Sequence, residues 1–231
     1  MYNTFKFAFT LAEVLITLVI IGIIAAMTLP ALINKTKNTE NLVALKKDYE
    51  TLSQAYYIFY SENGVIQNAL GSLTSDTDYE GFANVFIPKL NVAKNCGIKE
   101  ANASGCFPDK IYTYLDGTTT WKNFLLANNH SLILTNDGMS YAFVLFSATC
   151  SSQYSTDPSS PLYNTCGQVH VDINGPNKGP AIAGRDTFSF YITKKGVYPR
   201  GSYPDYTATS DCQIYGLGCA GQVLLNGSIN Y

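Results

Sequence analysis

The chain carries little charge and few of the side chains that catalysis uses most often. Charged residues make up 14% of its 231 residues, and it has two histidines and one tryptophan. No nucleophile elbow, glycine-rich phosphate loop or H-E-x-x-H motif occurs. Lysine and arginine form no run longer than two residues, so phosphate contacts to a nucleic acid are not indicated. We therefore expect neither an enzyme nor a nucleic-acid-binding protein.

Charge is scarcest in residues 9–33, which are almost all apolar and contain one charged side chain, Glu13. About 20 apolar residues span a bilayer core, so the run is long enough for a transmembrane helix. An acidic residue at the centre of such a helix costs about 2.5–3.5 kcal/mol, and less near its end. This cost favours a functional interpretation, in which a positive charge meets Glu13 only in an assembled state.

A short polar head, residues 1–8, precedes the apolar run and is expected to be a leader peptide. In a secretory signal peptide the small residue at the cleavage site follows the apolar core, whereas here Ala8 precedes it. Cleavage between Ala8 and Phe9 would keep the apolar helix and expose the Phe9 amine, four residues before Glu13. That amine is the candidate partner for Glu13. An uncleaved anchor, with Glu13 reaching the membrane interface, is the alternative.

The start of the apolar run has a specific pattern, formed by Phe9, Thr10, Leu11, Glu13, Gly22 and Pro30. In these residues the chain resembles the N-terminus of type IV pilins and of the pseudopilins of type II secretion systems. The resemblance covers residues 8–59. The family usually has glycine before the cleavage site, and Ala8 departs from this pattern.

The resemblance implies cleavage by prepilin peptidase, a membrane aspartyl peptidase, followed by methylation of the Phe9 amine. It implies assembly with sister subunits on a secretion or pilus platform, with Glu13 fixing the register and Gly22 and Pro30 softening the helix. It places the chain in the inner membrane as a single-pass protein with its head outside the cytoplasm. The expected function is that of a structural subunit of a type II secretion pseudopilus.

Two alternatives stay open at this point. One is a type IV pilin or minor pilin for adhesion, motility or DNA uptake. The other is a membrane-anchored binding domain that never polymerises.

The helical pattern continues over residues 34–63, beyond the expected transmembrane and filament-core helix of residues 9–33. Apolar residues recur every three or four positions, as on one face of a helix, at Leu42, Leu45, Tyr49, Leu52, Tyr56 and Phe59. Polar residues are expected on the opposite, exposed face, at Lys46, Lys47, Asp48, Glu50 and Gln54. We therefore expect one long helix whose second half packs on a sheet.

Residues 64–231 are expected to form an extracytoplasmic head, because the hydrophobic period there becomes alternating. The clearest signal is a hairpin around Asp137 and Gly138. Other strands are expected at residues 168–173, 187–193 and 222–225, and short helices near residues 82–90 and 120–128 in an otherwise loop-like segment. The expected fold class is α+β and pilin-like, with one long N-terminal helix packed on an antiparallel sheet of four or five strands and with disulfide-pinned loops.

Six cysteines lie in the head as three pairs of neighbours, Cys96 and Cys106, Cys150 and Cys166, and Cys212 and Cys219. An even number in an exported domain indicates disulfides, although six cysteines allow fifteen pairings. Pairing of neighbours is favoured, because each pair would close a short loop rich in glycine, serine or asparagine. Zinc is disfavoured, since no C-x-x-C occurs and the histidines lack finger-like spacing.

A polar loop between two expected strands, residues 171–186, is a candidate calcium site. Asp172, Asn174 and Asp186 could supply oxygen ligands, and loop carbonyls could complete the shell. The resemblance supports this idea, because major pseudopilins hold calcium in a loop of similar character. The spacing does not match an EF-hand. The alternative is that Asp172 and Asn174 cap a turn through bonds to the backbone.

Overall fold

The computed structural model describes residues 10–73, 75–98, 105–108, 112–117, 130–203 and 211–229. The chain divides into two units, Met1–Thr39 and Glu40–Tyr231. One helix, α1, runs over Leu11–Asn63 and so contributes to both units. Each unit is described by itself.

The first unit contains the apolar part of α1. Its large hydrophobic side chains, from Leu11 to Ile33, are 44–80% exposed. Such a helix is long and apolar enough to cross a membrane, as the sequence predicts. Pro30 lies inside α1, and the residues on both sides of it remain helical.

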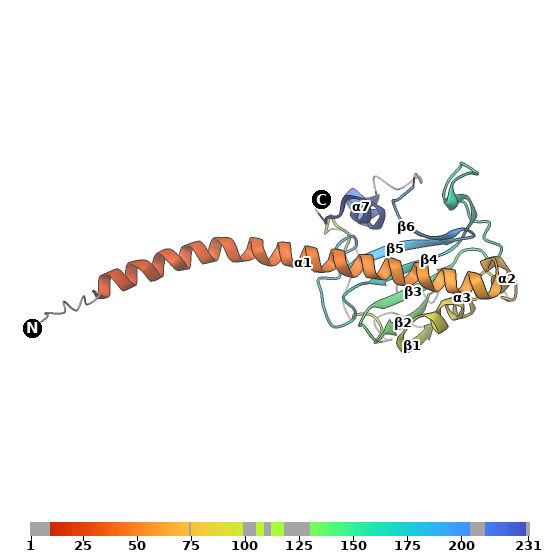
Figure 1. Cartoon of the computed structure of the whole chain (residues 1–231), viewed down its shortest axis with the longest axis horizontal. Coiled ribbons are helices and arrows are strands. Elements are labelled where there is room, and N and C mark those ends of the chain that lie inside the picture. Colours follow the sequence, from red (N-terminus) through yellow and green to blue (C-terminus); the bar gives the residue numbers. More distant parts are fainter. Residues whose placement is uncertain are drawn as a thin grey trace, which may run out of the picture. The chain divides into compact units, whose positions relative to one another are not determined.

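The second unit is built on the remaining part of α1, which lies along one face of a sheet (Figure 1). The spacing predicts this face, and Leu45, Leu52, Tyr56 and Phe59 are all buried. The Tyr56 hydroxyl adds a polar anchor, because it lies 3.1 Å from the carbonyl oxygen of Thr193 and 2.8 Å from that of Lys194. The apolar stripe thus sets which side of α1 meets the sheet.

Six strands form the sheet, in the order β1-β2-β3-β4-β5-β6 (Figure 1). Their bounds are Val92–Ile98 for β1, Ser131–Thr135 for β2, Ser140–Leu145 for β3, Thr165–Asp172 for β4, Thr187–Thr193 for β5 and Gly196–Pro199 for β6. Every neighbouring pair is antiparallel, so the sheet is a simple meander. The α+β class, with a long helix on an antiparallel sheet, is confirmed, but the sheet has six strands and not the four or five expected.

Short helices complete the head. They are α2 (Ile66–Leu70), α3 (Tyr79–Phe86), η1 (Ile87–Lys89), η2 (Pro161–Asn164), η3 (Asp211–Tyr215) and α7 (Cys219–Asn226). The main core lies between α1, α3 and the sheet, where Phe86 stacks on Phe143 with ring centroids 5.6 Å apart. A smaller core on the opposite face joins Leu132 and Ala142 to the loop residues Phe107 and Tyr112.

Strand β1 lies in a segment expected to be loop and short helices. It alternates poorly, because its central residues Lys94 and Asn95 are exposed. Its pairing with β2 also has two register shifts. An edge strand of this kind lacks the alternation of apolar and polar residues by which a strand is predicted from sequence. The expected helix near residues 82–90 is present as α3 and η1, whereas residues 120–128 lie outside the described residues.

The expectation of a strand at residues 222–225 is wrong, since these residues belong to helix α7. A short apolar run does not distinguish a strand from a helix. The local determinants favour the helix, because Ala220 and Val223 face the core and Gly227 caps the end in the left-handed region, with φ 67°.

A matched pair of substitutions tests the packing of α1 on the sheet. We expect Leu52→Ala to lower the free energy of unfolding of the head by about 2–5 kcal/mol, because a fully buried side chain leaves a cavity. Ile58→Ala, on the exposed side of the same helix, should change it by less than about 0.5 kcal/mol. Denaturant titration of the full chain in detergent measures both, and equal effects would contradict the packing described.

Candidate functional site

The N-terminal end of α1 is held by a hydrogen-bonded pair, Thr10 and Glu13. The Glu13 carboxylate accepts from the backbone N–H and the hydroxyl of Thr10, both at 2.8 Å. The Glu13 N–H donates in return to the Thr10 hydroxyl oxygen at 3.3 Å. This is a capping box, which satisfies backbone groups that a helix N-terminus leaves free. Glu13 therefore has a local structural role within its own chain.

The other predicted assembly residues are placed only in part. Ala8 and Phe9, the expected cleavage site, lie outside the described residues. Gly22 lies in α1, and a Cβ built on it would meet nothing within 4 Å. Pro30 lies further along the same helix. The structure thus places Glu13, Gly22 and Pro30 on one exposed helical segment.

The three predicted calcium ligands come together at the ends of strands β4 and β5. One oxygen of Asp172 accepts from the backbone N–H groups of Asn174 at 3.1 Å and Gly175 at 2.9 Å. Its other oxygen accepts a hydrogen bond from the Tyr112 hydroxyl. These contacts form the side-chain-to-backbone turn that the sequence analysis considered as the alternative.

The Asp186 carboxylate, like that of Asp172, accepts hydrogen bonds from backbone N–H groups. The donors are the N–H groups of Ala181, at 2.7 Å, and Ile182, at 2.5 Å. The Asn174 amide also donates to it, at 3.3 Å. Burial raises the pKa of Asp186, and burial together with the charge of Asp186 raises the pKa of Asp172 to about 7. The two acids thus make the loop of residues 173–186 a folded, hydrogen-bonded element.

This arrangement does not yet form a calcium shell. Calcium needs six to eight oxygen ligands, and the carboxylates here already accept bonds from N–H and O–H donors. No group of three or more acidic, histidine or cysteine side chains suited to a metal occurs among the described residues. A bound ion would have to displace some of these hydrogen bonds. The calcium site at Asp172, Asn174 and Asp186 stays a prediction.

Three disulfides pin the irregular parts of the head, and they join the neighbours that the sequence analysis favours. The pairs are Cys96–Cys106, Cys150–Cys166 and Cys212–Cys219. The first ties a loop to the edge strand β1, and the third ties η3 to α7. All six sulfur-bearing residues are buried, so the bonds act as structural links inside the head.

Both histidines are fully buried on the sheet face opposite α1. Their ring centroids lie 5.8 Å apart, and Nδ1 of His170 lies 2.8 Å from the Ser189 hydroxyl oxygen. Burial, with the charges of His130 and Arg200, holds the pKa of His170 well below its ordinary value. His170 is therefore neutral at physiological pH.

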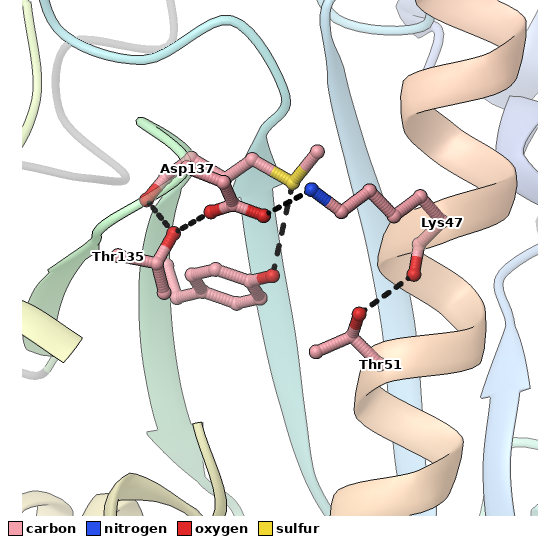
Figure 2. Close-up of polar contacts among 6 residues, drawn as sticks. Lys47, Thr51, Thr135 and Asp137 are labelled. Carbon is pink, nitrogen blue, oxygen red and sulfur yellow. Dashed lines mark hydrogen bonds and ion pairs between the residues drawn. The ribbon is translucent and has the colours of Figure 1, made fainter. Parts of the chain in front are cut away.

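A polar cluster links α1 to the turn of the β2–β3 hairpin (Figure 2). Lys47 of α1 reaches Asp137 in the hairpin turn, with Nζ and Oδ2 2.8 Å apart. The Thr135 hydroxyl also donates to Asp137, at 2.5 Å. Burial acts to raise the pKa of Asp137, but its contacts with Lys47 and Thr135 outweigh this and lower it. The hairpin tip is thus held to α1 by an ion pair.

Asp48, next to Lys47, corrects the sequence analysis, which expected it on the exposed face. It has no exposed surface and lies against the sheet. The spacing indicates this buried position, because Asp48 follows Leu45 by three residues and precedes Leu52 by four, so all three share one helix face. The capping box was readable too, because a threonine three residues before a glutamate preceding an apolar run is its usual signature.

No protein-family model, no curated protein and no solved structure matches the chain. The interpretation of the site therefore depends on its residues and their geometry.

The raised pKa of Asp172 predicts a pH-dependent stability. A buried acid whose pKa is about 7 when folded and about 4 when unfolded binds its proton more tightly in the folded state. Its stabilising contribution is complete below about pH 4 and is lost as the pH rises through about 7.

We expect Asp172→Asn, which keeps an oxygen acceptor for the turn, to reduce this loss between pH 5 and pH 8 by on the order of 2 kcal/mol. Denaturant unfolding of the full chain at both pH values measures it. Glu40→Gln, which removes an exposed acid, is the control. An Asp172→Asn profile identical to that of the unchanged protein would contradict the assignment.

Proposed function

We propose that this chain is a structural subunit of a filament of the type IV pilin-like class, most specifically of a type II secretion pseudopilus. The observation that carries the proposal is the exposed apolar part of α1 with an acidic residue near its start, joined to a disulfide-linked α+β head. Before assembly, residues 9–33 span the inner membrane as a single pass and the head lies outside the cytoplasm. The disulfides support this location, because such bonds persist in oxidising compartments.

Maturation supplies the positively charged partner that the Glu13 carboxylate lacks. Prepilin peptidase cleaves between Ala8 and Phe9, and the new Phe9 amine is then methylated. Subunits leave the bilayer on the assembly platform and bundle their apolar helices. An isolated buried charge in that bundle is strongly unfavourable, whereas a Glu13 carboxylate beside the Phe9 amine of a neighbour is compensated and fixes the axial register.

The capping box favours a second candidate, the membrane-anchored domain that never polymerises. Thr10 already gives the Glu13 carboxylate hydrogen-bond donors near the helix end, and no neighbouring subunit is needed for that role. The two candidates differ in what Glu13 must provide. A cap requires an acceptor oxygen at this position, whereas the filament requires a negative charge.

Two substitutions at Glu13 separate these roles. Glu13→Gln keeps the acceptor, since glutamine also serves in a capping box, but removes the charge. Glu13→Leu removes both. We expect both variants to remain in the membrane and to lose at least about tenfold of their incorporation into filaments, because one unpaired buried charge costs several kcal/mol.

The measurement compares the amount of subunit in sheared filaments with the amount in membranes, in cells whose own copy is replaced by the variant. Glu50→Gln, an exposed acid on the second part of α1, is the control and should incorporate normally. Wild-type incorporation of Glu13→Gln would contradict charge pairing and leave Glu13 with its capping role.

A further inference from the structure

Asp48 is a fully buried acid on a helix face where the sequence analysis expected apolar residues. It lies on the face of α1 that packs on the sheet, with no exposed surface, between Leu45 and Leu52. Neither carboxylate oxygen has a hydrogen-bond partner among the described residues. An ionised carboxylate in such a place costs far more than a neutral carboxylic acid does. The interface therefore discriminates between the two protonation states of Asp48.

The groups that face Asp48 strengthen this discrimination. From β3, the Tyr141 hydroxyl is near enough to lower its pKa, although it lies outside hydrogen-bonding geometry. From the hairpin turn, the negative charge of Asp137 raises that pKa. From α1 itself, Lys47 directs its ammonium group to Asp137. Ionised Asp48 would thus add a negative charge beside Asp137, whose ion pair already engages the ammonium group of Lys47.

Asp48 is the member of this group whose charge changes near neutral pH. Burial, as the main cause, raises its pKa to about 7. Burial also raises the pKa of Tyr141 well above its ordinary value, so Tyr141 stays protonated. Asp137, in contrast, has a lowered pKa and stays ionised.

We propose that Asp48 is a pH-sensitive latch that holds α1 on the β2–β3 hairpin when it is neutral and loosens that contact when it is ionised. This inference goes beyond filament assembly and does not depend on it. Because the folded state favours the protonated form, the contact is tight in acid and weakens as the pH rises through neutrality. The contact between α1 and the β2–β3 hairpin would then be more stable in an acidified compartment than in an alkaline one.

Hydrogen exchange of the full chain in detergent micelles tests the latch. The readout is the protection of backbone amides in residues 45–52 at pH 5.5 and pH 8.5, corrected for the intrinsic exchange rate. We expect protection to fall about tenfold or more over this range, since one pKa unit corresponds to a factor of ten in an opening equilibrium. Asp48→Asn, which mimics the neutral acid, should lose clearly less protection over this range than the unchanged protein, because only the contribution of Asp172 remains.

Glu50→Gln removes an exposed acid from the same helix and should behave like the unchanged protein. An equal fall in Asp48→Asn and in the unchanged protein would overturn the proposal, as would protection that does not vary with pH in the unchanged protein.

A second variant keeps the test decisive if Asp48→Asn does not fold. Tyr141→Phe removes the hydroxyl that lowers the pKa of Asp48, so the midpoint of the loss of protection should move to higher pH. An unchanged midpoint in this variant would also overturn the latch.

Discussion

The head depends on one contact, the apolar stripe that α1 lays on the six-stranded sheet. Leu45, Leu52 and Tyr56 are almost completely buried there, and each such side chain contributes about 1.5–3 kcal/mol by leaving water. An antiparallel sheet needs one face covered and tolerates a more polar covering on the other. Here α1 and α3 cover the first face with hydrophobic residues, and disulfide-pinned loops cover the second. The same helix also contains the exposed apolar residues 11–33.

Each part of α1 holds an acid in an apolar setting, and each solves the problem differently. Glu13 stands at the helix start, where Thr10 supplies donors and the helix dipole favours a negative charge. Asp48 stands in the middle of the buried stripe, where protonation is the cheaper state. In our proposals, assembly depends on the pairing of Glu13 with the amine of a neighbouring subunit. The packing of α1 on the hairpin depends on the protonation of Asp48.

Much of the fold could be predicted from periodicity. The spacing of three and four residues identifies the stripe of α1, and alternation identifies β2 to β5. Strand β1 was not predicted because exposed Lys94 and Asn95 break its alternation. Helix α7 was not predicted because its three successive apolar residues, Val223 to Leu225, suit a helix as well as a strand. The burial of Asp48 was not predicted because its charge suggests an exposed side chain, although its spacing from Leu45 and Leu52 places it on the buried stripe. The turn of Asp172 required Tyr112, sixty residues away, which no local pattern indicates.

The mature N-terminus tests the central claim most directly, because the proposed pairing of Glu13 requires the Phe9 amine that cleavage would expose. Mass spectrometry of the protein isolated from its native membrane reads that end of the chain without any substitution. We predict a polypeptide that begins at N-methylated Phe9 and lacks residues 1–8. A protein that retains Met1 and the residues after it would contradict the filament and identify the chain as a tethered domain.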